Sequence, residues 1–509
     1  MVHRSSQTIR LNDSDNVVVA RAGLPAGTEI PEEGIRCRAA IPAGHKIATA
    51  TMKRGEAVRK YGQVIGFATS HISPGEHVHT HNLEAGDFTR DYAVGSESKP
   101  TNYVDKRAQA TFKGILRPDG RVATRNYIGV LSTVNCSASV ARKIADSFTR
   151  EQLSRFPNVD GVTAICHGMG CAMPEGGEGF TYLQQAMAGY IRNPNLAGVL
   201  VVGLGCEGNS IDALFGNTGL AIGPSLQALT IQDVGGTSAA VRKGVSLVRD
   251  MLQEANRVER VSVPANTIIL GLECGGSDGY SGISANPALG GAADLLMRHG
   301  GTAVLGETPE IYGAEHLLTR RAASREVGEK LLARITWWER YLAGNNAYMD
   351  NNPSPGNKAG GITTILEKSL GAAAKGGSTD LMDVLNFAQP ITAKGLVFMD
   401  TPGYDPVSVT GMVAGGATII CFTTGRGSVF GCKPVPVIKL ATNTALYEGM
   451  EEDMDIDCGP IAEGGATVEE LGKKIFSSIL ETASGRKTKS EILGIGDNEF
   501  VPWHIGAVM

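Results

Sequence analysis

The chain has 509 residues, more than one hydrophobic core organises, so we expect two to four domains. Its 47 basic and 52 acidic residues are spread along the chain, which excludes the basic footprint of a nucleic-acid-binding protein. No apolar run reaches the roughly 18 residues of a membrane helix, and the N-terminal residues contain no signal-peptide core, so we expect a cytoplasmic protein without membrane contact.

Glycine and cysteine are the residue types whose use is informative. The 66 glycines are about twice the usual share of roughly 7%, which is typical of tight turns and of loops that surround a ligand. The nine cysteines are odd in number and lie mostly in apolar or glycine-rich segments, so a disulfide framework is not expected. We expect free thiols, available for metal binding or catalysis.

Residues 1–85 predict a small all-β module. Short β-type runs, among them NVVVA, HKIAT and GQVIGFA, are separated by the turn sequences LPAG, IPAG and ISPG. Residues 86–112 lose apolar periodicity and gain charge, which predicts a linker or a strap across a neighbouring domain.

From residue 113 onward, strand-like apolar runs alternate with helical stretches, which predicts α/β architecture with a parallel sheet. We divide this part into a middle region, 113–395, and a C-terminal part, 396–509. Between 307 and 389 helix replaces strand, and the segment SREVGEKLLARITWWERYLA carries an apolar face, so we expect a helical subdomain or an interface there. The predicted strands are YIGVLST, GVTAIC, AGVLVVG, NTIILGL, GLVFMD and ATIICF.

Three predicted strands are followed by a cysteine. Open parallel sheets bind ligands beyond the carboxyl ends of their strands, so these loops are candidates for a site. Cys171, Cys206 and Cys274 follow GVTAIC, AGVLVVG and NTIILGL. If the strands are neighbours, the thiols converge on one crevice, where thiolate and imidazole ligands suit iron or zinc. The expected metal ligands are His167, Cys171, Cys206 and Cys274.

Other interpretations of the cysteine loops stay open. Cysteine is among the most buried residue types, and burial is the favoured explanation for Cys166 and Cys421, which lie inside apolar runs. Cys136 opens a predicted helix, whose dipole would favour its thiolate. The segment GLGCEG matches the dinucleotide fingerprint, but the acidic residue expected at the end of a strand about 20 residues later is missing.

The segment GEHVHTHN places three of the chain's ten histidines at alternate positions. On an extended strand His77, His79 and His81 would point to one face, about 6 to 7 Å apart, so they would bind one ion only if the strand were distorted. A polar strand face is the alternative. We expect His79 or His81 to reach the active site. His45 and Lys46 of the segment GHKIA would lie beside them, and these four are the candidate catalytic residues.

Polar residues of the predicted loops are candidates for binding a carboxylate. Lys358 and Arg426 lie among glycines and turn-forming residues at predicted loop tips, an arrangement suited to that role. Arg125 and Lys439 are weaker candidates, and each of these cations is alternatively a solvated surface charge. The expected substrate-binding residues are Arg125, Asn126, Ser277, Asp278, Lys358 and Arg426.

Seven segments resemble the altronate and galactarate dehydratases, which eliminate water from sugar acids, and the likeness extends over nearly the whole chain. The resemblance implies an N-terminal β-clip module of the SAF type, a middle region with dimer contacts, a Rossmann-like C-terminal region and a homodimer. It also implies an iron-dependent hydro-lyase, for which we expect Fe²⁺, with Mn²⁺ in its place as an alternative. Because three cysteines could hold a cluster with one open iron, an iron-sulfur cluster is a further alternative. The segments are GHKIA, KYGQVIG, GEHVHTHN, GLGCE, ECGGSDGYSGISANPALG, NPSPGNKAGGITT and FTTGRGS.

This chemistry agrees with the candidate residues. Removing a proton beside a carboxylate forms an enediolate, whose charge a divalent metal neutralises. A base takes the C2 proton and an acid protonates the departing C3 hydroxyl, and histidine serves either role near neutral pH. The row HVHTHN resembles altronate-type members, so we expect altronate to be converted to 2-dehydro-3-deoxy-D-gluconate. Galactarate dehydration and a non-catalytic sugar-acid-binding protein are the alternatives.

Overall fold

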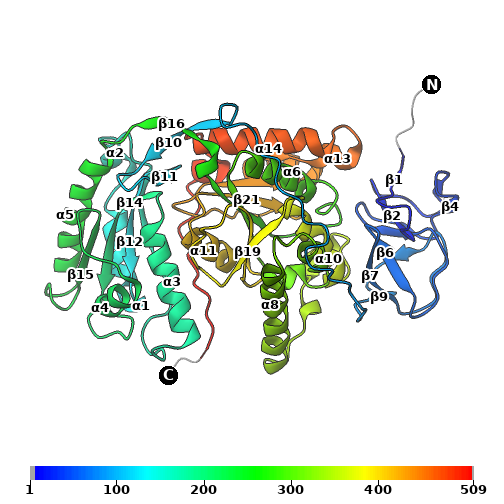
Figure 1. Cartoon of the computed structure of the whole chain (residues 1–509), viewed down its shortest axis with the longest axis horizontal. Coiled ribbons are helices and arrows are strands. Elements are labelled where there is room, and N and C mark those ends of the chain that lie inside the picture. Colours follow the sequence, from blue (N-terminus) through cyan, green and yellow to red (C-terminus); the bar gives the residue numbers. More distant parts are fainter. Residues whose placement is uncertain (1–5, 507–509) are drawn as a thin grey trace.

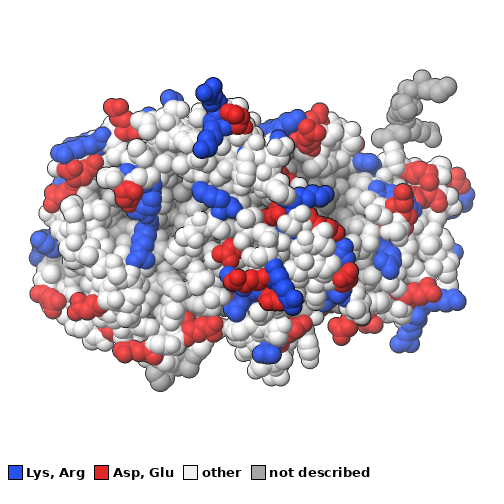
Figure 2. Space-filling view, viewed as in Figure 1, with Lys and Arg blue, Asp and Glu red and all other residues white. Residues whose placement is uncertain are grey.

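The computed structural model describes residues 6–506, which form three parts in a row (Figure 1). The β module lies at one end, the second domain (residues 113–264) lies at the other, and the C-terminal domain (residues 265–506) lies between them. Basic and acidic side chains are interspersed on the face shown in Figure 2. Within residues 6–506, no helix combines the length and the apolar character needed to cross a membrane.

The β module consists of short antiparallel strands, as predicted. On β2, Val17 and Val18 point to opposite sides and join two separate apolar clusters, because side chains alternate along a strand. The first cluster also contains Leu370 and Ala373 of the C-terminal domain, so the module shares part of its core with that domain. Its strands are β1 (Thr8–Ile9), β2 (Val17–Ala20), β3 (Glu29–Ile30), β4 (Ile35–Arg36), β5 (Lys46–Ala48), β6 (Ala57–Lys60), β7 (Gln63–Ala68), β8 (His77–Val78) and β9 (Leu83–Glu84).

Residues 86–112 form a strap across the C-terminal domain, one of the two predicted possibilities. The backbone N–H of Gly95 donates to the carbonyl of Thr319 at 2.9 Å, and the hydroxyl of Ser98 donates to Asp380 at 2.6 Å. These contacts hold the connection against the domain that it crosses.

The second domain is a four-stranded parallel sheet, in the order β13-β12-β14-β15, with helices on both faces. The runs YIGVLST, GVTAIC and AGVLVVG form β12, β13 and β14, as predicted. Helices α1 and α5 pack on one face, and α3 packs on the other, toward the C-terminal domain (Figure 1). Its elements are β12 (Tyr127–Ser132), α1 (Asn135–Asp146), α2 (Arg150–Leu153), β13 (Gly161–Ile165), α3 (Glu178–Arg192), β14 (Leu196–Gly203), α4 (Ile211–Thr218), β15 (Leu226–Thr230) and α5 (Thr237–Ala255), and a small antiparallel sheet of β10 (Thr111–Leu116), β11 (Val122–Ala123) and β16 (Arg260–Pro264) adjoins it.

The C-terminal domain contains one seven-stranded parallel sheet, in the order β19-β20-β18-β17-β21-β22-β23. Because β19 and β20 pair in this sheet on either side of the expected boundary at 395, that boundary would cut the domain, and the prediction is wrong. The two α/β domains divide near residue 264. The strands are β17 (Ile269–Cys274), β18 (Thr302–Leu305), β19 (Leu381–Leu385), β20 (Gly395–Met399), β21 (Ile419–Thr424), β22 (Val437–Ala441) and β23 (Ile456–Asp457).

The predicted helix after Ser324 is confirmed as α8, Arg325–Gly344, and the Ser324 side chain caps it by accepting a hydrogen bond from the N–H of Val327. Leu331 and Ile335 pack in the same core cluster as the sheet strands, so this helix belongs to the C-terminal domain and is not a separate subdomain. The other helices are α6 (Ala285–Arg298), α7 (His316–Thr319), α9 (Pro355–Ala359), α10 (Ile365–Ala373), α11 (Asp405–Gly415), α12 (Thr444–Gly449), α13 (Gly459–Glu463), α14 (Val468–Ala483) and α15 (Lys489–Leu493).

Arg125 and Asn126 connect the start of β12 to its surroundings. The fully buried guanidinium of Arg125 forms a bidentate ion pair with Glu491, at 2.5 and 2.8 Å, and donates to the carbonyl of Thr482. The amide of Asn126 donates to the carbonyl of Ala255 at 2.8 Å. These donors are used inside the protein, which corrects the expectation that the two residues bind substrate.

Replacing Arg125 by Met should lower the free energy of unfolding by about 3 to 5 kcal/mol, because the Glu491 carboxylate loses its buried partner. Urea and thermal unfolding followed by circular dichroism measure the change. Arg121→Met is the matched control, since Arg121 pairs with Asp119 at an exposed position, where an ion pair contributes about 0 to 1 kcal/mol. Equally small effects of the two substitutions would contradict a structural role for Arg125.

Candidate active site

Three histidine rings of the β module meet at its contact with the C-terminal domain. Strands β5 and β8 pair antiparallel, with Ile47 opposite His77, which brings His45 beside the histidine row. Nδ1 of His45 lies 3.0 Å from Nε2 of His77. One ring nitrogen from each of His45, His77 and His79 lies within 4.8 Å of the others, so the three are close enough to share one ion.

A turn explains how alternate histidines converge. Strand β8 ends at Val78, and Asn82 closes the turn that follows: its Oδ1 accepts from the N–H of His79 at 2.9 Å, and its amide donates to the carbonyl of His77 at 3.0 Å. The row is therefore not one continuous strand, and the spacing of about 6 to 7 Å does not apply. His81 is exposed, with its ring centroid 5.5 Å from that of His77.

Burial keeps these rings neutral. Removal from water and the neighbouring imidazoles lower the pKa of His77 to about 3, and burial together with Lys46 lowers the pKa of His79 to about 4. Burial also lowers the pKa of His45. Among residues 6–506, Nδ1 of His79 is buried and finds no hydrogen-bond partner. Neutral imidazole is the form that binds a metal ion, so these rings suit that role.

A buried carboxylate beside the histidines joins the module to the C-terminal domain. Glu367, on α10, accepts from Nζ of Lys46 at 2.8 Å and from Nζ of Lys60 at 3.0 Å, and all three side chains are at most 2% exposed. The N–H and hydroxyl of Thr363 donate to the same carboxylate. Burial alone would raise the pKa of Glu367, but the two ammonium groups lower it far below its ordinary value. Lys46, expected to be catalytic, is held in this network.

The segment NPSPGNKAGG of the C-terminal domain supplies carbonyl groups to the module. The carbonyl of Ala359 lies 3.3 Å from Nε2 of His45, and the carbonyl of Gly361 accepts from Nζ of Lys46 at 2.6 Å. Gly361 has φ +104°, and a Cβ there would lie 2.7 Å from the carbonyl oxygen of Gly44, so glycine is required for this approach.

Arg426 and Lys358 provide positive charge beside the histidines. Arg426 is exposed and lies against Gly360, where an added Cβ would be 3.2 Å from its Cδ. Lys358 lies on α9 in the same segment and is half-buried. Within residues 6–506, neither cation forms an ion pair. Lys439, in contrast, is fully buried in β22, with Nζ 3.7 Å from Asp453.

Ser277 and Asp278 lie in the loop after β17 and help to build this interface. Asp278 is buried and accepts from the hydroxyl of Thr442 at 2.9 Å and from the amide of Asn443 at 3.1 Å. The carbonyl of Ser277 accepts from the amide of Asn357 at 2.8 Å. These contacts connect the loops after β17 and β22 to the segment NPSPGNKAGG. Ser277 and Asp278, which were expected to bind substrate, therefore hold these loops together through contacts inside the protein.

Cys274 ends β17 inside a buried network of acids and lysines. Its thiol donates to Glu307 at 3.4 Å and Glu310 at 3.5 Å, while Nζ of Lys375 lies 3.0 Å from Glu307 and Nζ of Lys368 lies 2.6 Å from Glu310. Burial and the carboxylates raise the pKa of the thiol well above its ordinary value. Because ammonium groups already neutralise these carboxylates, the network suits a metal ion less well than the histidine group does.

The expected crevice shared by three thiols does not exist. Cys171 and Cys206 follow β13 and β14 of the second domain, whereas Cys274 ends a strand of the other sheet. The amino end of that strand, at Ile269, lines the contact with the second domain, so its carboxyl end points away from it. The prediction is wrong because the apolar runs show where strands lie in the sequence but not which sheet each strand joins. His167 is buried in the second domain, with its ring 6.0 Å from that of Phe500.

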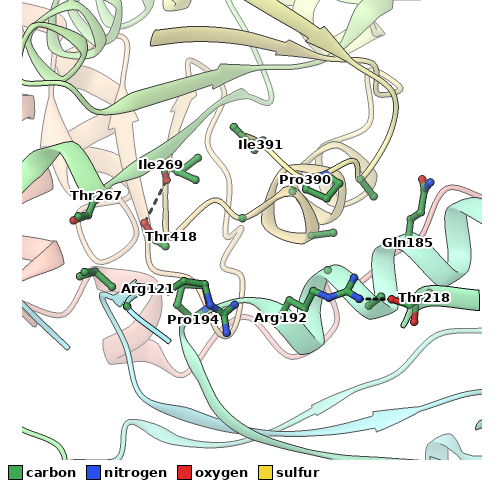
Figure 3. Close-up of a pocket in the computed structure, with 18 of the residues that line it drawn as sticks. Arg121, Gln185, Arg192, Pro194, Thr218, Thr267, Ile269, Pro390, Ile391 and Thr418 are labelled. Atoms are coloured by element: carbon green, nitrogen blue, oxygen red, sulfur yellow. Dashed lines mark hydrogen bonds between the residues drawn. The ribbon is translucent and has the colours of Figure 1, made fainter. Parts of the chain in front are cut away.

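A cavity of about 510 Å³ lies between the second and C-terminal domains (Figure 3). Gln185 and Arg192 of α3 line one side, and Ile269, Pro390 and Ile391 line the other. It lies at the amino end of β17, whereas open α/β sheets bind ligands at the carboxyl ends. Of the residues described as lining it, none belongs to the predicted site, so it is not the candidate active site.

Three family models match the chain in succession. The altronate/galactarate dehydratase SAF domain matches residues 6–86, the second domain of D-galactarate dehydratase/altronate hydrolase matches 114–256, and the C-terminal domain of D-galactarate/altronate dehydratase matches 265–508. The chain belongs to the altronate/galactarate dehydratase family. The matched ranges agree with the three structural parts, including a division near residue 264.

Relatives with different named activities are similar to this chain in sequence. An altronate dehydratase of Bacillus subtilis is 35% identical over 95% of this chain and 96% of its own length. A galactarate dehydratase (L-threo-forming) of Escherichia coli is 37% identical over 94% of this chain and 93% of its own length. A (2R)-sulfolactate sulfo-lyase subunit beta of Chromohalobacter salexigens is 32% identical over 77% of this chain and 96% of its own length. The chain is a sugar-acid dehydratase by its kinship to the first two.

Sequence reasoning missed two members of the interface and undervalued a third. Lys60 lies in the segment KYGQVIG, which carried the family resemblance but no individual role. Glu367 stands in a helical pattern where an acidic residue is ordinarily solvated, so nothing in the pattern indicated its burial. His77 was the first member of the histidine row, and a β5–β8 pairing would have indicated its approach to His45.

Replacing Glu367 by Gln should loosen the β module, because two buried ammonium groups lose the charge that compensates them. Hydrogen exchange measured by mass spectrometry should then rise in β5, β6 and α10. Glu329→Gln is the matched control, since Glu329 pairs with Arg325 on the exposed face of α8. Unchanged exchange at the module in the Glu367 variant would contradict this account of docking.

Proposed function

We propose that this protein is a metal-dependent hydro-lyase that removes water from altronate at the interface between the β module and the C-terminal domain. The observation that carries the proposal is the group of neutral imidazoles of His45, His77 and His79, whose ligand atoms lie within 4.8 Å of one another. Two cations of the adjoining loops, Lys358 and Arg426, form no ion pair within residues 6–506. Membership in the dehydratase family supports the reaction class.

The histidine group fits a divalent ion on chemical grounds. Its donors are neutral nitrogens, and one of them, Nδ1 of His79, is buried without a hydrogen-bond partner among the described residues. Imidazole suits iron, so we assign Fe²⁺ to this group, with Mn²⁺ as the alternative. When bound, the ion would act as a Lewis acid toward oxygen atoms of the substrate.

Arg426 and Lys358 are the groups that we propose bind the substrate carboxylate. A guanidinium can donate two parallel hydrogen bonds to a carboxylate, and Arg426 has no competing acidic partner among residues 6–506. Arg125 and Lys439 are buried in other contacts and are not available. We assign both cations to the one carboxylate of altronate, because a dicarboxylate would need a further cation at its far end. Galactarate is the second candidate, because a galactarate dehydratase is among the relatives.

The elimination also needs a base for the C2 proton and an acid for the departing C3 hydroxyl. The four predicted catalytic residues all lie in this interface: His45, Lys46, His79 and His81. We assign His45 and His79 to the metal ion, and Lys46 is buried in its ion pair with Glu367, so exposed His81 is the candidate that remains for proton transfer. Because these residues come from the β module and the cations come from the C-terminal domain, we propose that the module is part of the active site and not an appendage.

Replacing His77 by Ala should weaken binding of Fe²⁺ and lower kcat/KM. Loss of a residue that only hydrogen-bonds a metal ligand costs roughly 10- to 100-fold, and loss of a ligand itself should cost more. Iron content after equilibrium dialysis and anaerobic turnover measure the two effects. His71→Ala is the matched control, because His71 is an exposed histidine of the same module outside the group. Removal of the metal by a chelator should abolish turnover, and full activity of metal-free enzyme would contradict the assignment.

Supplied with altronate, galactarate and related aldonates in separate anaerobic assays, the iron-loaded enzyme should form 2-keto acid with the highest kcat/KM from altronate. The reason is that, if Lys358 and Arg426 both bind the one carboxylate of altronate, neither is left to pair with the second carboxylate of galactarate, and an unpaired charge in a site discriminates strongly. Arg426→Gln should raise KM for altronate. Faster dehydration of galactarate would overturn the substrate assignment and leave the hydro-lyase assignment intact.

A further inference from the structure

Three exposed cysteines lie at one edge of the second domain, outside the proposed active site. Cys136, Cys171 and Cys206 follow β12, β13 and β14, which are adjacent in the order β13-β12-β14. All three thiols are exposed, whereas five of the nine cysteines are buried. Free cysteine is among the most buried residue types, so three exposed thiols at neighbouring strand ends need an explanation.

Hydrogen bonds next to each cysteine tie the three loops together. The N–H of Asn135, which precedes Cys136, donates to the carbonyl of Met169 at 3.1 Å. The carbonyl of Gly170, which precedes Cys171, accepts from the N–H of Asn209 at 3.0 Å. The loops after β12, β13 and β14 therefore form one unit at the carboxyl edge of the sheet.

Glu207 fixes the third loop. Its carboxylate, next to Cys206, accepts from the hydroxyl of Thr133 at 2.6 Å and from the N–H groups of Leu204 and Gly205 at 3.0 and 2.7 Å. All these contacts are internal, so Glu207 holds the loop in shape and leaves Cys206 at its surface.

Two glycines allow this close approach. Gly170 has φ +102°, and a Cβ there would lie 2.3 Å from the carbonyl oxygen of Thr133. A Cβ on Gly208 would lie 2.8 Å from the carbonyl oxygen of Cys171. Any larger residue at either position would push the cysteine loops apart.

We propose that Cys136, Cys171 and Cys206 bind a [4Fe–4S] cluster. Thiolates around a single zinc ion, with Zn–S bonds of about 2.3 Å, lie about 3.8 Å apart. Among the described residues, the three sulfurs are not a group within 4.8 Å of one another, so a single ion would require the loops to move. A cluster attaches each cysteine to a different iron and accepts wider spacing.

Three cysteines leave the fourth iron of such a cluster without a thiolate, on the exposed side of the loops. That iron is open to an oxygen ligand, such as a carboxylate or hydroxyl group. The site goes beyond the proposed function, because it lies in another domain from the histidine group and does not depend on which sugar acid is dehydrated. A mononuclear iron at the histidines carries no sulfide, so sulfide content reports on the cysteine site alone.

The test uses the full-length protein, purified and reconstituted anaerobically with Fe²⁺, sulfide and a thiol reductant. Wild type should bind about four sulfides per chain and show the visible absorption of an iron-sulfur cluster. Cys136→Ser, Cys171→Ser and Cys206→Ser should each lose at least half of the sulfide and the absorption, and the triple variant should lose all of it. Cys166→Ser is the matched control, since its half-buried thiol in the same domain donates to the carbonyl of Ala138.

Thermal unfolding of each variant establishes that the fold is retained, which exposed serine substitutions should allow. Wild type that binds no sulfide would overturn the proposal, as would one zinc per chain without sulfide. A triple variant that keeps its cluster would overturn the assignment to these cysteines. Wild type that binds sulfide but does not dehydrate altronate would count against the proposed function and not against this site.

Discussion

The candidate site depends on the buried ion pairs that the carboxylate of Glu367 forms with two lysines of the β module. This carboxylate forms ion pairs with Lys46, which begins β5, and with Lys60, which ends β6, so it fixes two strands of the β module against α10. His45 immediately precedes Lys46, and its position follows from that anchor. Three charges buried together are stable only as a set, because removing one leaves the others uncompensated. The histidine group is set within the module by the β5–β8 pairing and the Asn82 turn, and docking places it against Ala359 of the C-terminal domain.

Docking also divides the chemistry between two parts of the chain. The module contributes imidazoles and buried lysines, and the C-terminal domain contributes carbonyl groups, the Glu367 carboxylate and the exposed Arg426. Under the proposed function, the neutral donors for the metal ion come from the module and the cations for the carboxylate come from the C-terminal domain. The apolar cluster that the two parts share, through Leu370 and Ala373, makes this contact part of the fold.

The sequence predicted the strands well, because apolar runs such as AGVLVVG and ATIICF are typical of strands that a parallel sheet buries on both faces. It failed where the answer depends on which strands are neighbours. Cys274 ends a predicted strand, as expected, but that strand lies in a different sheet from β13 and β14, so its thiol cannot join Cys171 and Cys206. The boundary at 395 failed for the same reason. Glu367 was missed because burial of a charge depends on partners that are about 300 residues away in the sequence.

Under the proposed function, we expect differences in substrate within this family at residues that do not hold the scaffold together. Asp278 and Arg125 have their polar atoms engaged by neighbouring loops and helices, so a substitution at either would disturb the scaffold before it changed a ligand contact. Arg426 and His81 are exposed at the interface and carry no such duty. A change of charge at such a position alters what the site can bind at little cost in stability. Relatives named for altronate and for galactarate, which are similar to this chain over 94 to 95% of its length, could thus keep one scaffold, because the contacts that hold it together are separate from those proposed to face the ligand.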